Sequence, residues 1–282
     1  MEARLDHPIF DPVRPWVEGL KDFSLESFNL LAEKSKLRTE SGKPIRFVSP
    51  ASADPYYELH LFETGCVQTR AGNWHDRFNA LAWLAFPRTK ARINAMHAAQ
   101  IPREREQSGG RRGRLRDLLT IFDEGGAIVE CANPELEEMI REFRWKDLFS
   151  ENRARVLLGL RVHVLGHAVL EQALQPYPGI TCKIIFADPA RDLDAQAAAW
   201  LGAKGRTPGD LPPLPVFGYP GWFPGNDRAE FYADERYFRP FKREPPTRQR
   251  CSAVKSVPGA GQAAAASQDV EESPGSTERD AG

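Results

Sequence analysis

Hydrophobic and polar positions along the chain change their period repeatedly, so that short strand-like runs alternate with longer helix-like segments. Apolar runs at 45–48, 127–131 and 181–187 predict strands, and the alternating segment 58–63 predicts a fourth. Helical spacing follows Asn–Trp and Asn–Pro pairs typical of helix starts. The predicted helices run over 73–86, 87–100, 115–122, 133–144, 156–175 and 193–201. This order predicts an α+β fold with a small sheet, in which helix predominates.

The composition changes at Pro245. The segment 245–282 contains no Leu, Ile, Met or aromatic residue and is rich in Ala, Gly, Ser and Pro. Such a segment cannot bury enough apolar surface to offset the entropy that it would lose on ordering. We therefore expect a single globular domain over 1–244, followed by a disordered tail.

Charge and composition exclude several classes of protein. The 282 residues include 38 Lys and Arg against 39 Asp and Glu, which excludes a strongly cationic nucleic-acid coat protein but leaves a local basic site open. The longest apolar stretch, 156–170, is too short for a membrane span and is interrupted by charged residues. The first residues lack the features of a signal peptide, and the four Cys lie far apart. We expect a cytoplasmic protein without membrane association.

Polar side chains stand on two consecutive helices, 73–86 and 87–100, that are otherwise largely apolar. Buried carboxylate, amide, amine and imidazole groups are costly unless they are paired. They therefore either satisfy one another, with Asp76 capping its own helix, or surround a ligand. We favour a ligand site, because a Lys, a His and two Asn exceed what capping requires. Asp76 and Asn79 share one face of the first helix, with His75 nearby. One face of the second helix carries Lys90, Asn94 and His97.

A second pattern consists of His163, His167 and Glu171, spaced at i, i+4 and i+8 in the predicted helix 156–175. This spacing lets imidazoles on one helix face reach a single metal ion. The alternative is that they are core histidines on a helix whose other face is apolar. His167 is the stronger candidate, because Gly166 before it allows close approach of another backbone.

Arginines are concentrated in the Gly-rich segment 101–116. The segment suits a phosphate-binding loop or a nucleic-acid contact, with Arg112 and Arg114 as candidate substrate ligands. It contains no aromatic residues that could stack on bases, so single-strand recognition is disfavoured and nucleic acid is the less favoured partner. A solvent-exposed loop is the alternative.

Asp123 and Glu124 are predicted at the C-terminal end of a helix, where the helix dipole disfavours negative charge. A cation would offset that cost, so the pair is a candidate for metal coordination or for a general base. The alternative is that the pair has no function. Further along, the aromatic residues of the Pro/Gly-rich segment 205–226 predict an ordered loop, with Trp222 as a candidate lid.

Several motifs are absent. The chain has no P-loop, no GxGxxG and no GxSxG elbow, and no Cys stands in a pattern that marks a nucleophile. Kinase, Rossmann dehydrogenase and α/β-hydrolase assignments therefore have no support.

Four motifs follow one another in a defined order: TRAGNWHDRFNALAWLAFPRTKARINAMH, RLRDLLTIFDEGGA, LGHAVLEQALQPYPGITCK and FGYPGWFPGN with the following FYAD and YFRP. From about Tyr57 to Pro240, the chain resembles the bacterial domain-of-unknown-function family 3025, which implies no established activity. His163 does not clearly belong to a motif, which weakens its pairing with His167. The resemblance places these residues at family-motif positions: Arg70, Trp74, His75, Asp76, Asn79, Lys90, Asn94, His97, Asp123, Glu124, His167 and Trp222.

Our leading hypothesis is a hydrolase-type enzyme that acts on a phosphorylated or otherwise anionic small substrate. His75, Asp76, His97 and Lys90 are the candidate catalytic residues. Substrate would be bound by Arg70, Asn79, Asn94, Arg112, Arg114 and Trp222. A divalent metal ion, if the enzyme uses one, would draw its ligands from His75, Asp76, His97, Asp123, Glu124 and His167.

Two other hypotheses compete. One is a non-catalytic module that binds a small anionic ligand or RNA. The other is a scaffold in which the polar cluster is purely structural and the tail recruits a partner. Nothing in the sequence indicates the oligomeric state.

Overall fold

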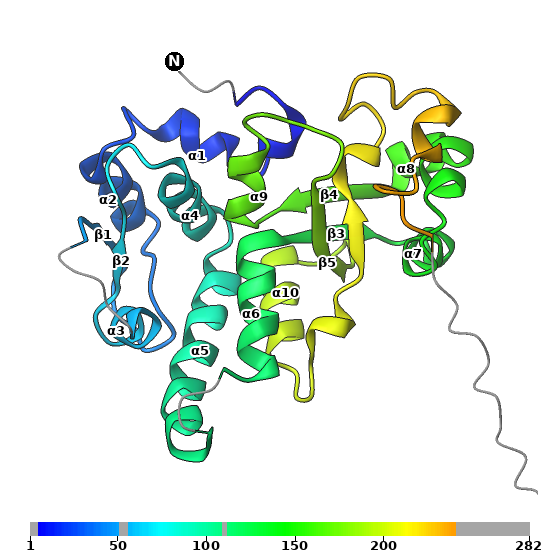
Figure 1. Ribbon diagram of the computed structural model, residues 1–282. Coiled ribbons are helices and arrows are strands. Elements are labelled where there is room, and N and C mark those ends of the chain that lie inside the picture. Colours follow the sequence, from blue (N-terminus) through cyan, green and yellow to red (C-terminus); the bar gives the residue numbers. More distant parts are fainter. Residues whose placement is uncertain (1–4, 51–55, 109–111, 241–282) are drawn as a thin grey trace, which may run out of the picture. The chain divides into compact units, whose positions relative to one another are not determined.

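The computed structural model describes residues 5–50, 56–108 and 112–240 (Figure 1), which belong to the compact unit Met1–Lys242. The helices are α1 (Arg14–Gly19), α2 (Leu25–Lys34), α3 (Tyr57–Thr64), α4 (Trp74–Ala85), α5 (Pro87–Ser108), α6 (Arg114–Gly125), α7 (Pro134–Arg141), α8 (Arg153–Gly159), α9 (His167–Gln172) and α10 (Leu193–Gly202). The strands are β1 (Arg46–Val48), β2 (Cys66–Gln68), β3 (Gly126–Cys131), β4 (Leu160–Val164), β5 (Thr181–Ala187) and β6 (Pro213–Pro215). This arrangement confirms the α+β, helix-dominated fold.

The central sheet has the strand order β4-β3-β5-β6. Strand β3 is antiparallel to β4 and parallel to β5, while β5 is antiparallel to β6. Side chains on both faces of β3 are buried, because Ile128 packs with Leu118 and Phe122 of α6, whereas Val129 packs in the larger core with Val162. Strands β1 and β2 form a separate two-stranded parallel sheet.

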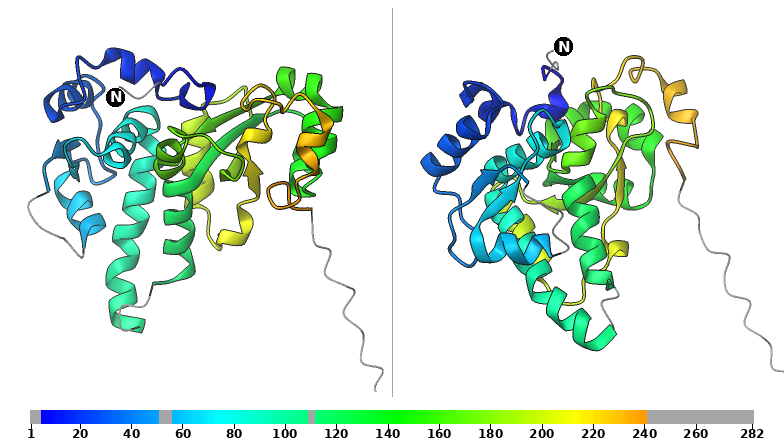
Figure 2. Two further views of the ribbon diagram at one scale, coloured as in Figure 1. Left: turned by 45° about the horizontal axis from the view of Figure 1, so that its top comes forward. Right: turned by 60° about the vertical axis from the view of Figure 1, so that its left-hand side comes forward.

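Helices α4, α6 and α9 pack around the end of the central sheet where β3 begins (Figure 2). The contact between α6 and α9 depends on two glycines. The backbone N–H groups of Leu165 and Gly166 both donate to the carbonyl of Gly126, at 3.0 and 2.8 Å. A Cβ at Gly166 would lie 2.6 Å from the Gly126 nitrogen, so only glycine fits this crossing. The predicted close approach at Gly166 is confirmed, and it places His167 beside the last turn of α6.

Local capping signals in the sequence are also confirmed. Asn73 caps α4, since its side chain accepts a hydrogen bond from the backbone N–H of Asp76, and Asn133 caps α7 in the same way. In the loop 205–226, the predicted aromatic anchors are buried, and the Tyr219 hydroxyl donates to the Leu160 carbonyl at 2.7 Å.

Two element predictions are wrong. The segment 58–63 is helical, as part of α3, which ends at Gly65 with φ +79°. The alternation of Leu59 and Leu61 with polar residues is typical of a strand, but in the structure Leu61 is buried on one side of a helix.

The predicted long helix 156–175 is divided into α8, β4 and α9. Residues 160–164 alternate buried and more exposed side chains, as expected for an outer strand with β-branched Val162 and Val164. His163 therefore lies on β4 and His167 on α9, so the two histidines do not share a helix face. The His163 ring faces Glu130 of β3, with 3.1 Å between Nε2 and Oε2.

The predicted tail, 245–282, and the Gly-rich centre of the arginine segment, 109–111, lie outside the described residues. Within the described part of the chain, no helix is both long enough and apolar enough to cross a membrane.

Candidate metal centre

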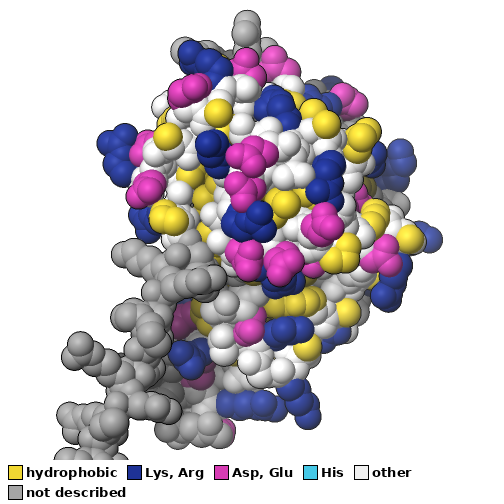
Figure 3. Space-filling view, turned by 90° about the vertical axis from the view of Figure 1, so that its right-hand side faces the viewer, with side chains coloured by type: hydrophobic (Ala, Val, Ile, Leu, Met, Phe, Trp, Pro, Cys, Tyr) yellow, Lys and Arg dark blue, Asp and Glu magenta, His cyan; other side chains and the backbone are white. Residues whose placement is uncertain are grey.

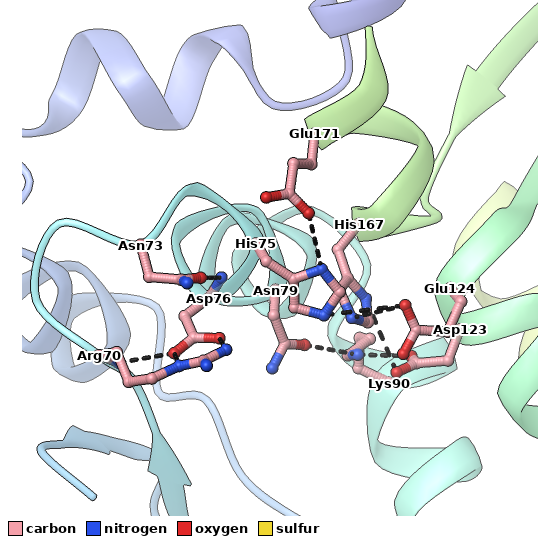
Figure 4. A network of polar contacts seen from close by, with 10 residues as sticks. All are labelled: Arg70, Asn73, His75, Asp76, Asn79, Lys90, Asp123, Glu124, His167 and Glu171. Atoms are coloured by element: carbon pink, nitrogen blue, oxygen red, sulfur yellow. Dashed lines mark hydrogen bonds and ion pairs between the residues drawn. The ribbon is translucent and has the colours of Figure 1, made fainter. Parts of the chain in front are cut away.

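Three helix ends bring a group of ionisable side chains together (Figure 4). His75 stands in the first turn of α4, Asp123 and Glu124 in the last turn of α6, and His167 and Glu171 on α9. The structure therefore brings together His75, Asp123, Glu124 and His167, four of the six candidate metal ligands, whose proximity the sequence left open.

The two imidazole rings converge on one carboxylate. His75 Nε2 lies 3.8 Å, and His167 Nε2 3.4 Å, from Oε2 of Glu124. The rings are nearly perpendicular, with centroids 4.4 Å apart. One ligand atom from each of the three residues lies within 4.8 Å of the other two, which is compatible with binding one ion.

These separations are compatible with a shared ion. A hydrogen bond between an imidazole N–H and a carboxylate oxygen has an N···O distance of about 2.9 Å. Two ligand atoms that each lie about 2.0–2.1 Å from a tetrahedral metal ion are roughly 3.3 Å from each other. The observed 3.4 and 3.8 Å are long for hydrogen bonds and close to the spacing of two atoms that share a cation.

The other nitrogen of each ring faces a second carboxylate. His75 Nδ1 donates to Oε2 of Glu171 at 3.0 Å. His167 Nδ1 lies 3.8 Å from Oδ2 of Asp123 and is buried without a hydrogen bond to any described residue. A carboxylate at Nδ1 directs the lone pair of Nε2 outward and is a common companion of metal-bound histidines.

Asp123 is itself held by Lys90 of α5. The Lys90 ammonium donates to Oδ1 of Asp123 at 2.5 Å and to Oδ1 of Asn79 at 2.8 Å, and it is only 4% exposed. Burial acts to raise the pKa of Asp123, but the positive charge of Lys90 and the nearby His167 outweigh it and lower the pKa. Asp123 is therefore ionised at neutral pH, and Lys90 is the partner of a buried carboxylate.

The cluster carries excess negative charge. The pKa of Glu124 is lowered, chiefly by its interaction with His167, which overcomes the opposing effect of burial. Three carboxylates, Asp123, Glu124 and Glu171, stand against the one ammonium of Lys90, so these four side chains carry a formal charge of −2, which a divalent cation would balance. The side chains of Glu124 and Glu171 are each 43% exposed, so the cluster is open to solvent on one side.

Asp76 lies beside this cluster but is occupied by Arg70. Its carboxylate accepts two hydrogen bonds from the Arg70 guanidinium, both at 2.8 Å, and a third from the Arg70 backbone N–H. Burial acts to raise the pKa of Asp76, and these hydrogen bonds outweigh it, so the pKa is lowered. Asp76 therefore fixes the turn before α4. The Asn73 backbone N–H donates to the Arg70 carbonyl and not to Asp76, so the alternative in which Asp76 caps the helix through that N–H is incorrect.

Asn94 and His97 form a separate buried polar group further along α5. The Asn94 amide donates to the carbonyl and carboxylate of Glu58, at 2.8 and 2.7 Å. His97 Nδ1 accepts from Arg116, which is also paired with Glu104. Burial lowers the pKa of His97 to about 4. His97 is thus neutral, and its ring is bound to α6 instead of joining His75 and His167.

The three remaining candidates are also placed elsewhere. Arg112 is exposed and pairs with Asp117 at 3.1 Å, and Arg114 is exposed. Trp222 is 7% exposed and packs against Tyr219, while its carbonyl accepts a hydrogen bond from His7.

Sequence reasoning underestimated two residues. Glu171 entered only as a companion of His163 and His167, whereas in the structure it accepts a hydrogen bond from His75. Glu58 was missed because its segment was predicted as a strand. Burial raises the pKa of this carboxyl, although the hydrogen bond from Asn94 opposes the effect.

The comparisons with known proteins agree with the motif order. The chain matches the family model described as "protein of unknown function (DUF3025)" over residues 45–242, a region that contains every residue of the cluster. No curated protein and no solved structure matched the chain. Because the matched region covers well over half of the sequence, the protein belongs to the DUF3025 family.

Proposed function

We propose that this protein is a metal-dependent hydrolase in which His75, His167 and Glu124 hold one divalent cation. The observation that carries the proposal is the convergence of both Nε2 atoms on Glu124, with a carboxylate facing each Nδ1 atom. Direct hydrogen bonding among the three residues would not require this spacing.

The donor set indicates the class of metal. Two imidazole nitrogens and one carboxylate oxygen favour zinc or a neighbouring transition metal over calcium or magnesium. Three protein ligands leave a coordination position for water, and a cation of this kind lowers the pKa of bound water to about 7, which supplies a nucleophile for hydrolysis.

The surrounding side chains have distinct roles in this proposal. Glu171 orients His75 through Nδ1, and Asp123, held by Lys90, does so for His167. Arg70, whose side chain is 60% exposed, lies on the His75 side of the cluster and presents positive charge to solvent (Figure 4). That charge favours a small anionic substrate.

Total metal content of the purified, tag-free protein tests the proposal. We expect near-stoichiometric zinc, manganese or iron in the wild type, and its loss from His75→Ala, His167→Ala and Glu124→Gln. His163→Ala is the matched control, since the His163 ring lies on β4 and faces Glu130 of β3. This variant should retain the metal. Hydrolysis of phosphate-ester, carboxylic-ester and amide model substrates should be lost in the same three variants.

Two results would contradict the proposal. If the wild type is metal-free and zinc, manganese and iron leave its melting temperature unchanged, the cluster is structural. If metal is bound but no model substrate is hydrolysed, a non-catalytic binding module is the better description.

No observation favours the RNA-binding alternative. In the arginine segment, Arg112 and Arg116 are already paired with Asp117 and Glu104. On the face drawn in Figure 3, basic and acidic side chains are intermingled, with hydrophobic ones between them, so this face carries no continuous basic surface for a polyanion.

A further inference from the structure

A cavity of about 1210 Å³ lies at the far edge of the central sheet. Strand β6 pairs with β5 only along Thr181–Lys183, so the next residues of β5, through Phe186, form one wall. The ends of α7 and α10 and the segment around Leu211 form the others. None of the residues that line this cavity belongs to the metal centre, so the cavity is a separate feature.

The lining is strongly basic. Five cationic side chains line the cavity, against the single carboxylate of Asp210. That carboxylate is used locally, because it accepts hydrogen bonds from the Thr207 backbone and hydroxyl. The cations are Arg141, Lys183, Arg206, Arg236 and Arg239.

Three of these cations, Lys183, Arg206 and Arg239, form no ion pair with a described residue, although the charge of Arg206 adds to the Thr207 hydrogen bonds in lowering the pKa of Asp210. Arg236 is paired with Asp234 at 2.9 Å. By contrast, Lys183 donates only to the Leu211 carbonyl, at 3.2 Å, and neither it nor Arg206 forms an ion pair with any other described residue. The Nε of Arg206 is buried and makes no hydrogen bond within the described part of the chain. A buried, unsatisfied donor on a cation indicates that an anionic acceptor completes the site.

Aromatic rings surround the same cavity. The Arg206 guanidinium lies 4.2 Å from the ring centroid of Trp200, and that of Arg141 lies 4.5 Å from Phe186. Phe143 stacks on Trp145 and has φ +58°, a left-handed conformation at the end of α7 where glycine is usual. Rings backed by arginines suit a flat, electron-rich ligand, and the volume admits one of nucleotide size.

We propose that this cavity binds an organic phosphate that carries an aromatic group, with the phosphate at Lys183 and Arg206 and the aromatic group against Trp200. The dianionic phosphate matches the charges of Lys183 and Arg206, neither of which forms an ion pair with a described residue. The aromatic walls account for selection of an organic phosphate over inorganic phosphate. This site is independent of the proposed metal centre.

Calorimetric titration of the full chain with phenylphosphonate tests this proposal, since the probe combines a ring with a dianion and has no ester to hydrolyse. We expect measurable binding, with weaker binding of inorganic phosphate and of benzyl alcohol. Arg206→Gln and Lys183→Met should each weaken phenylphosphonate binding roughly tenfold or more. Arg191→Gln, at an exposed arginine outside the cavity, is the matched control and should bind as the wild type does.

Phosphonates also bind metal ions, so His167→Ala separates the two sites. Retained binding in His167→Ala together with loss in Arg206→Gln and Lys183→Met supports the cavity. Loss in His167→Ala with retention in the two cavity variants would overturn it and locate the probe at the metal centre. Equal binding by all variants, or no binding by the wild type, would also overturn it. Circular dichroism checks that each variant is folded, and the two cavity variants serve as independent tests.

Discussion

A histidine presents one nitrogen to a metal, and the partner of its other nitrogen decides which one. At His75 that partner is Glu171, in a hydrogen bond of 3.0 Å. At His167 it is Asp123, at 3.8 Å, which Lys90 holds in place. Each ring thus faces a carboxylate at Nδ1, but only that of His75 makes a hydrogen bond there.

Replacing Glu171 by Gln should weaken metal binding without removing a ligand. The amide cannot polarise Nδ1 of His75 as the carboxylate does, so we expect a loss of roughly 10–100-fold in zinc affinity. Competition with a chromophoric chelator measures the affinity. Glu138→Gln, at an exposed position of α7, should leave it unchanged. Equal affinities for Glu171→Gln and the wild type would show that Glu171 does not support a ligand.

Replacing Lys90 by Met should destabilise the protein strongly. The substitution leaves the carboxylate of Asp123 buried without its counter-ion, and removal of one partner from a buried ion pair costs about 3–5 kcal/mol. Urea unfolding measures the change. The double variant Lys90→Met/Asp123→Asn should recover part of the loss, because it removes both charges. If the double variant were no more stable than Lys90→Met, the pair would not be the cause.

At the scale of elements, local signals were predictable from the sequence and partners between elements were not. The helical spacing of the sequence places Lys90, Asn94 and His97 on one face of α5, and all three are buried. Two other helices then bind these side chains: Asp123 and Arg116 of α6 bind Lys90 and His97, and Glu58 of α3 binds Asn94. Because sequence periodicity shows only that a face is polar, it could not divide this face among its partners.

The same distinction explains the candidate metal centre. Every proposed ligand was among the sequence candidates, but so were His97 and Asp76, which other side chains occupy. The error over 156–175 also came from periodicity, since an apolar run interrupted by polar residues is compatible with both helix and strand. Gly159 and Gly166, at the two ends of β4, mark the change of element.

Substituting Ala for Gly166 tests the crossing of α6 and α9. The new Cβ would meet the Gly126 nitrogen at 2.6 Å and the Glu124 carbonyl at 2.7 Å, so the backbones must separate. We expect a loss of about 1–3 kcal/mol in the free energy of unfolding, together with weaker metal binding. Gly159→Ala is the control, because its Cβ would meet nothing within 4 Å and should change neither quantity. A Gly166→Ala variant with wild-type stability would disprove the crossing.

At the scale of the whole molecule, buried ionisable groups connect stability to pH. His97 faces Asp123, Arg116, Arg112 and Lys90, and burial lowers its pKa from 6.5 to about 4. The unfolded chain therefore binds a proton at a higher pH than the folded protein does. The contribution of His97 to the free energy of unfolding is complete above pH 6.5 and is lost as the pH falls towards 4.

Comparison of the wild type with His97→Gln isolates this effect. Between pH 7 and pH 4.5, the free energy of unfolding should fall by about 2–3 kcal/mol more in the wild type than in the variant. Chemical unfolding at several pH values measures the difference. Carboxylates that do not interact with His97, such as Asp76, affect both proteins alike, so parallel pH profiles would show that His97 does not titrate as described.

The three proposed ligands come from distant parts of the chain, at positions 75, 124 and 167. A cation held by all three would act as a removable cross-link that closes two long loops, 75–124 and 124–167. Such closure restricts the unfolded chain more than the folded one, in the same way as a disulfide between distant residues. The availability of the metal would then determine the lifetime of the folded state, as well as whether the proposed metal centre is complete.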